Sequence, residues 1–311
     1  MLSRVADSLY WMSRYFERAQ NGARVLEATY NLILNPAKFS TEQRWYRALR
    51  WLVPQQGGAE QDPQRMMKRL ASEADDRASI LSCVACAREN ARQVREEISS
   101  EMWEYLNRLY HRLLQSGQQL DDEAGAMRLL AEVRGASYRF QGITDLTMHH
   151  GEGWHFIQLG TYSERAPNLS LLLDAYFSTD APADDLDWVG LLASCNAFEP
   201  FCKTYTADLK PERVAEFILY HPDFPYSLRY SVEGMHSALG SIMNLSSGRN
   251  VEKIDRLIGR LRASLAYGQI TEVMAGGIHK YVRDIVDQCR GVHAAVHEAF
   301  IDYPIEVAFE S

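Results

Sequence analysis

The sequence predicts an all-α protein in which two related multi-helix bundle halves pack into one unit. Over long stretches, apolar residues recur at steps of three and four, the spacing of one face of an α-helix. Strand-like alternation with hairpin turns is nearly absent. No proline occurs between Pro63 and Pro167, and most other prolines stand where a periodic apolar stretch stops. Together these observations favour many helices joined by short loops.

The first helix is expected close to the N-terminus, where one apolar face continues over several turns. That face consists of Met12, Phe16, Ala19, Ala23, Leu26 and Tyr30. Comparable periodicity over residues 79–114 and 251–267 predicts further helices. Pro167 lies inside another helical pattern, so we expect that helix to be kinked there or to begin anew. Breaks between helices are expected at Pro36, Pro54, Pro182, Pro211, Pro222 and Pro225.

A short segment recurs at an offset of 147 residues and indicates an internal duplication. The first copy reads Tyr15-Phe16-Glu17-Arg18-Ala19-Gln20-Asn21, and the second reads Tyr162-Ser163-Glu164-Arg165-Ala166-Pro167-Asn168. Two further landmarks recur in the same order, Trp45 with Leu49 as Trp188 with Leu192, and Ser79-Ile80 as Ser227-Leu228. We therefore predict an N-terminal half of residues 1–148 with an intact Glu-Arg motif and a C-terminal half of residues 149–311 with a degenerate one.

Composition places the chain among globular proteins. It has 311 residues, of which 46% are apolar and 24% charged. No stretch reaches the apolar length of a membrane span, and Arg4 and Asp7 argue against a secretory signal. Five cysteines favour a reducing compartment, so we expect a cytoplasmic protein without a membrane partner. The net charge of −8 disfavours nucleic acid as a partner.

The polar face of the first helix is the strongest candidate site. With a turn of about 100° per residue, one stripe opposite the apolar face carries Arg14, Glu17, Arg18, Asn21 and Arg24, flanked by Tyr10 and Trp11. Three interpretations stay open: an exposed face with helical ion pairs, a buried Glu–Arg network that joins the halves, or an anion site. In an anion site, arginines bind carboxylate or phosphate while Glu17 orients a guanidinium or accepts a proton.

The second copy of the motif has lost two guanidiniums. Thr161 and Leu171 stand where the first copy has Arg14 and Arg24, which makes the N-terminal copy the better candidate for a working site. Glu17 and Arg18 form the candidate catalytic pair. The candidate substrate-binding residues are Arg14, Asn21, Arg24, Arg88, Arg92, Glu164, Arg165 and Asn168. Arg88 and Arg92 share a helix face with Arg95, which is either solvated or supplies positive charge to the same site.

Other chemistry has weaker support in the sequence. Cys83 and Cys86 form a single C-x-x-C inside a helical pattern, which favours core packing over a redox or metal site. Cys195 and Cys202 are interpreted as buried or partly buried thiols. A cluster of His149, His150, Glu152 and His155 has no partner pair elsewhere, so no metal is predicted. Nucleotide-binding glycine motifs and nucleophile motifs are absent, so no cofactor is predicted and catalysis by this chain stays open.

The sequence resembles the bacterial alpha-E family, a helical domain named for its Glu-Arg motif. The resemblance is carried by residues 1–6 and 9–19 and by the segments 87–92, 101–107 and 154–160, and it continues into Glu164-Arg165-Ala166. It spans essentially the whole chain. By resemblance, the signature residues are Glu17, Arg18, Glu164 and Arg165. The Gly-Arg that usually precedes the second motif of the family is Gly160-Thr161 here, which puts a second intact site in doubt.

The resemblance also implies a functional setting. Members of the family are typically encoded beside, or fused to, circularly permuted ATP-grasp proteins and transglutaminase-like peptidases. This implies a bacterial system that synthesises or modifies peptides, with an ATP-grasp ligase and a transglutaminase-like peptidase as partners. In one hypothesis the Arg/Glu face binds a carboxylate, an acyl-phosphate or a peptide intermediate. In the other hypothesis, the chain is a non-catalytic scaffold or partner subunit, and its Glu-Arg motifs are structural. Either hypothesis allows an oligomer.

Overall fold

The computed structural model describes residues 1–34, 44, 45, 47, 62–118, 120, 123–177, 183–245 and 251–301. Every regular element in these ranges is helical and none is a strand, so the predicted all-α class is confirmed. The expected breaks at Pro36, Pro54 and Pro182 lie outside the described residues, as does Leu49. Nor does any helix within the described ranges combine the length and apolar character needed to cross a membrane.

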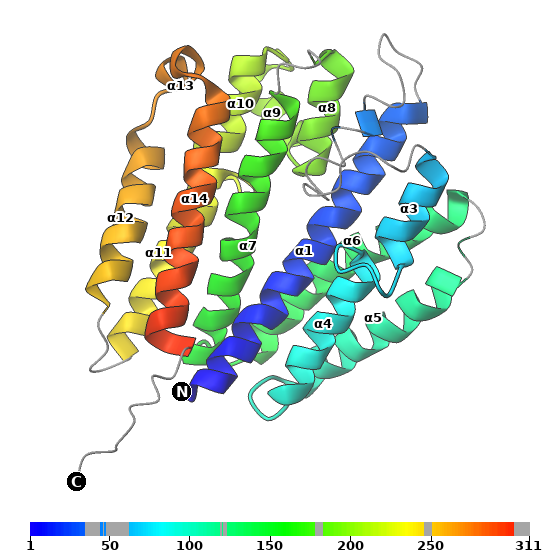
Figure 1. Ribbon diagram of the computed structural model, residues 1–311, viewed down its shortest axis with the longest axis vertical. Helices are drawn as coiled ribbons and strands as arrows, with labels where there is room; N and C mark the ends of the chain where they lie inside the picture. The colour runs from blue at the N-terminus through cyan, green and yellow to red at the C-terminus, as the bar shows by residue number, and fades with distance from the viewer. Residues whose placement is uncertain are drawn as a thin grey trace.

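From α3 (Pro63–Ser72) onward, short connections separate the successive helices (Figure 1). Up to residue 148 the elements are α1 (Ser3–Leu34), α3 (Pro63–Ser72), α4 (Ile80–Gln93), α5 (Ser100–Gln118) and α6 (Glu123–Thr147). The following elements are α7 (Glu152–Tyr176), α8 (Asp185–Ser194), α9 (Phe198–Tyr205), α10 (Pro211–Tyr220), α11 (Leu228–Leu245), α12 (Glu252–Tyr267), α13 (Ile270–Gly276), α14 (Ile278–Val296) and a π-helical turn (His297–Ile301).

Helices α1 and α7 lie side by side at the centre of the molecule (Figure 1). They run parallel, because the Met1 amino group contacts Glu152 at 2.9 Å while Glu17, further along α1, pairs with Arg165. Gly160 permits the close approach, since a Cβ there would overlap the carbonyl oxygen of Tyr10. Helices α4 and α6 pack against α1, and helices α11 and α14 pack against α7. The two central helices thus bring the two Glu-Arg segments together.

The predicted apolar face of α1 is buried except at Tyr30, which is partly buried against the core. Met12, Phe16, Ala19, Ala23 and Leu26 belong to one hydrophobic core that continues through α7, α11 and α14. The polar face opposite is also covered, by α7 and its neighbours, so α1 is enclosed along most of its length. Burial around most of the circumference forces the buried polar residues of α1 to find partners inside the protein.

Two prolines mark the bounds of α10 as predicted. Pro211 occupies the first turn of α10, where its missing N–H costs no hydrogen bond, and Pro222 follows the end of this helix. The periodic segment 79–114 falls into two helices, α4 and α5. Of the two alternatives expected at Pro167, a new helix start is wrong, because α7 continues through this residue from Glu152 to Tyr176, and the kink stays a prediction.

Candidate functional site

The two Glu-Arg motifs pair with each other across the α1–α7 contact. Glu17 accepts hydrogen bonds from Arg165, with Oε1 at 2.7 Å from Nε and Oε2 at 3.0 Å from Nη2. Glu164 accepts hydrogen bonds from Arg18, with Oε1 at 2.7 Å from Nε and Oε2 at 3.1 Å from Nη2. Each motif therefore gives its carboxylate to the arginine of the other. Of the three interpretations of the polar face, this geometry matches the buried network.

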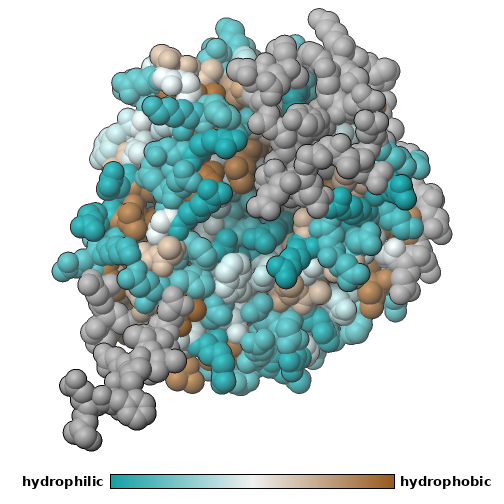
Figure 2. Space-filling view, viewed as in Figure 1, coloured by the Kyte–Doolittle hydropathy of each residue, from teal (hydrophilic) through white to brown (hydrophobic). Residues whose placement is uncertain are grey.

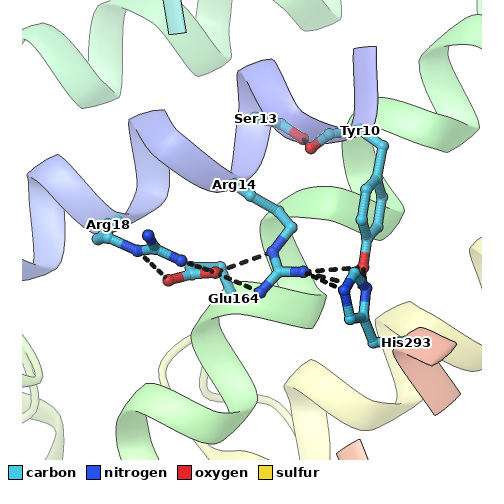
Figure 3. Close-up of polar contacts among 6 residues, drawn as sticks. All are labelled: Tyr10, Ser13, Arg14, Arg18, Glu164 and His293. Atoms are coloured by element: carbon cyan, nitrogen blue, oxygen red, sulfur yellow. Dashed lines mark hydrogen bonds and ion pairs between the residues drawn. The ribbon is translucent and has the colours of Figure 1, made fainter. Parts of the chain in front are cut away.

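Arg14 adds a second cation to one of the two pairs. Its Nε and Nη2 both lie 2.9 Å from Oε2 of Glu164, so this carboxylate is shared by two guanidiniums (Figure 3). Glu17 has Arg165 as its single cationic partner among the described residues. Arg14, Arg18 and Glu164 thus carry a net charge of +1, whereas Glu17 and Arg165 are balanced.

A tyrosine and a histidine complete the Arg14 side of the network. Tyr10 lies with its hydroxyl 2.9 Å from Nδ1 of His293, and Nη1 of Arg14 is 3.1 Å from the same nitrogen (Figure 3). The His293 ring is stacked on the Tyr10 ring with centroids 5.7 Å apart. Burial, together with the charges of Arg14 and His297, lowers the pKa of His293 to about 4. His293 is therefore neutral near pH 7 and accepts hydrogen bonds there.

Burial distinguishes the members of the network. Glu17, Glu164 and Arg165 are nearly inaccessible, whereas the side chain of Arg18 is 38% exposed and that of Arg14 is 12% exposed. Burial alone would raise the pKa of Glu164, but the guanidiniums of Arg18 and Arg14 outweigh it and hold that pKa below its usual value. The carboxylate is thus kept ionised inside the protein.

Asn21 and Arg24 form a second buried layer beside the pairs. Arg24 donates from Nη2 to Oδ1 of Asn21 and from Nε to the carbonyl oxygen of Ser194, at 3.1 Å in the second case. The ring of Tyr226 lies 4.1 Å from the Arg24 guanidinium and 4.4 Å from that of Arg165. Both predicted residues therefore contribute to packing between α1, α8 and the segment that precedes α11.

Arg88 and Arg92 are not brought to this network. Arg88 donates to Oδ1 of Asn107 at 2.6 Å and lies over aromatic rings of α5. Arg92 forms an exposed i,i+3 pair with Glu89 on the surface of α4. Helix α4 ends at Gln93, so Arg95 lies outside it. The prediction that Arg95 shares a helix face with Arg88 and Arg92 is therefore wrong. A shared helix face specified the direction of these side chains, but gave no information about their distance from α7.

The remaining candidates have structural surroundings. Asn168 is partly buried on α7. Cys83 is a buried free thiol and Cys86 a partly buried one, and burial raises the pKa of Cys83 to about 12. His150 stacks on Trp154 with ring centroids 4.3 Å apart. Within the described ranges, no group of three or more His, Cys, Asp or Glu side chains is arranged to hold a metal ion.

Sequence reasoning missed three members of the site. His293, Tyr226 and Pro225 reach it from segments far along the chain, and Pro225 accepts a hydrogen bond from Nη1 of Arg165 at 3.1 Å through its carbonyl oxygen. No local pattern marks these residues, because a backbone carbonyl or a single histidine carries no spacing signal. Only the packing of α14 and of the segment before α11 against the central helices identifies them.

Comparisons with known proteins identify a family that shares the Glu-Arg motif. A family model, described as a predicted alpha-helical domain with a conserved ER motif, matches residues 1–301. Uncharacterised proteins of Mycobacterium bovis and of two Mycobacterium tuberculosis strains are 24% identical over 319 residues, which cover 95% of this chain. The chain spans only 36% of the length of these relatives. No solved structure gives a significant match.

Proposed function

The chain belongs to the Alpha-E family, and we propose that it is a helical partner subunit in which the Glu-Arg motifs are structural. The observation that carries this proposal is the reciprocal pairing of the motifs. Arg165 uses Nε and Nη2 for Glu17 and Nη1 for the carbonyl oxygen of Pro225, so each of its three nitrogens already has an acceptor. A guanidinium engaged in this way is poorly placed to receive an anionic substrate.

We further propose that the two halves, 1–148 and 149–311, arose by duplication. The exchange of Glu-Arg partners between two parallel helices is the pattern that a two-fold relation between equivalent segments produces. A second parallel supports it: Ser79 and Ser227 each donate from Oγ to a carbonyl oxygen six residues earlier, at 2.5 and 2.6 Å. Pro63 and Pro211 each open a ten-residue helix. On this proposal the motif is the internal joint of a duplicated fold.

The proposed setting is a cytoplasmic bacterial system that synthesises or modifies peptides. The family resemblance suggests a circularly permuted ATP-grasp ligase and a transglutaminase-like peptidase as partners. The relatives support a role beside another protein unit, because the region that matches this chain is 36% of their length. In this setting the chain would assist the ligase without carrying the reacting groups itself.

A second candidate function is the binding of a small acid or peptide carboxylate on the Arg14 side. Two arginines share one carboxylate there, and Arg18 keeps an exposed fraction of 38%. His293 is neutral near pH 7, so the excess positive charge of the cluster comes from Arg14 and Arg18 alone. Figure 2 shows that the face on which α1, α7 and α14 come forward is hollowed near its centre among hydrophilic residues. The shared carboxylate and the exposed fraction of Arg18 favour an anion on the Arg14 side over one at Arg165.

The two functions are separated by reconstituting peptide ligation with the proposed ATP-grasp partner. The partner-subunit proposal predicts that the isolated chain forms no product, that ligation requires the chain, and that a folded Arg18→Gln variant supports it fully. If ligation proceeds completely without the chain, the proposal is wrong. If folded Arg18→Gln copurifies with the ligase but no longer supports ligation, or loses a bound acid, the second function is favoured.

A further inference from the structure

A cavity of about 340 Å³ opens beside the Glu17–Arg165 pair, on a different set of residues from the Arg14 cluster. It lies between α1, α6, α7 and α11, with Glu17 and Arg165 in its wall. This volume is at the lower end of those that hold small ligands. Because two helices from each half contribute to it, the cavity exists only when the halves are packed together.

The charged residues in the cavity wall favour a ligand of positive charge. Of the described residues that line the cavity, Glu17, Asp145 and Arg165 are charged, which gives a net charge of −1. Three of the five N–H donors of Arg165 are engaged by Glu17 and by the carbonyl oxygen of Pro225. Each oxygen of Glu17 accepts one hydrogen bond from Arg165, and a carboxylate oxygen can accept about two. The Glu17–Arg165 pair is therefore balanced in charge, and Asp145 decides the net charge of the cavity wall.

Asp145 supplies the unbalanced charge. It is an exposed residue of α6, and its Oδ1 accepts a hydrogen bond from Nε1 of Trp154 at 3.3 Å. Within the described part of the chain, no lysine or arginine forms an ion pair with it. A negative carboxylate held by an indole N–H at the edge of a cavity attracts a cation and repels an acid.

Aromatic rings line the same space. Trp154, Tyr162 and Tyr230 contribute to the wall, and the two tyrosine rings meet edge to face with centroids 6.3 Å apart. Burial raises the pKa of Tyr162 to about 12, so its phenol stays neutral and its ring keeps an uncharged face. Aromatic faces attract ammonium groups, most strongly where water is partly excluded. Gln158 and Thr161 add neutral donors and acceptors that suit amide groups.

We propose that this cavity binds a primary ammonium group, held by Asp145 and by the aromatic rings beside the Glu17–Arg165 pair, with neighbouring amide groups on Gln158 and Thr161. The ligand class is the amino end of a short peptide or a lysine side chain. The proposal is independent of the partner role and of the acid site on the Arg14 side, since it rests on other residues and on the opposite charge.

The test follows the indole N–H signal of Trp154 by NMR, assigned with a Trp154→Phe variant. The full chain is titrated to about 20 mM with alanylalanine amide, with Nα-acetyl-lysine amide and with N-acetyl-alanylalanine amide, which lacks the ammonium group. We expect saturable shifts of the Trp154 signal with one or both ammonium probes. The probe that binds more tightly shows whether the ammonium group comes from a peptide amino end or from a lysine side chain. The acetylated dipeptide is expected to bind at least tenfold more weakly, about 1.4 kcal/mol.

Two variants make the test specific. Asp145→Asn, at an exposed position, is expected to weaken the binding of the ammonium probe at least tenfold. Asp287→Asn, at an exposed carboxylate of α14, is the matched control and is expected to leave the affinity unchanged. The proposal is overturned if no ammonium probe binds, if the acetylated dipeptide binds equally well, or if Asp145→Asn binds like the unchanged chain.

Discussion

Glu17 of α1 and Arg165 of α7 form a buried ion pair with two parallel hydrogen bonds, of 2.7 and 3.0 Å. Their side chains are 2% and 5% exposed, so water cannot replace either partner. A buried charge that loses its partner destabilises a protein by about 3–5 kcal/mol, whereas an intact pair contributes little net stability. The proposed structural role of the Glu-Arg motifs therefore predicts that either partner alone is harmful to the α1–α7 contact.

The two arginines of the motifs should differ in their importance for stability. Arg165→Gln leaves Glu17 without a cation and is expected to cost about 3–5 kcal/mol of unfolding free energy. Arg18→Gln leaves Glu164 with Arg14, and Arg18 is partly exposed, so a loss of about 1 kcal/mol is expected. Urea denaturation of the two variants measures both losses. Equal losses of unfolding free energy in the two variants would contradict the finding that Arg14 and Arg18 share Glu164.

The close packing of the central helices predicts a penalty for a single methyl group. In Gly160→Ala the new Cβ overlaps Oγ of Ser13 and the carbonyl oxygen of Tyr10, so α1 and α7 must move apart. We expect a loss of about 1–3 kcal/mol. Gly142→Ala in α6 is the control, because its added Cβ meets no described atom from another element within 4 Å. This control should be neutral or up to about 1 kcal/mol more stable, and a matching effect at both glycines would refute the contact.

The low pKa of His293 predicts a loss of stability in mild acid. An unfolded histidine takes up a proton near pH 6.5, but in the folded protein His293 does so only near pH 4. The unfolded state therefore binds more protons between these values, and stability falls as the pH decreases from 6.5 to 4. Because the ring is half-buried, we expect about 1–2 kcal/mol from this group.

Urea titrations at several pH values test this origin. His293→Gln should flatten the decline between pH 6.5 and 4, whereas His111→Gln, at an exposed position on α5, should leave it unchanged. An identical decline in the His293 variant and the unchanged chain would show that other groups cause the acid sensitivity.

Thiol labelling should follow burial. Burial raises the pKa of Cys83, Cys195 and Cys289 to about 12, so few thiolates form at pH 8. Iodoacetamide is expected to label the partly exposed Cys86 and Cys202 first, as read by peptide mass spectrometry. Rapid labelling of Cys83 in the native protein would mean that the α1–α4 contact opens readily.

The helices were predictable because periodicity and proline positions are local properties of a sequence. The polar stripe on α1 was found in the same way, but the sequence could not say what covers it. A helix with one apolar and one polar face looks like a surface helix, and only the packing of α7 shows that Glu17 is buried. Arg88 shows the same limit, since its helix face was visible in the sequence and its Asn107 partner was not.

The most direct test of the structural role is a double-mutant cycle on Glu17 and Arg165. Glu17→Gln, Arg165→Gln and the double variant are compared by urea denaturation, with the exposed Glu89–Arg92 pair as a reference cycle. We predict that each single variant loses about 3–5 kcal/mol, that the double variant loses less than their sum by at least about 2 kcal/mol, and that the reference pair shows no measurable coupling. Single variants with unchanged stability, or strictly additive losses, would contradict the account and return the Glu-Arg motif to the search for a ligand or a reaction.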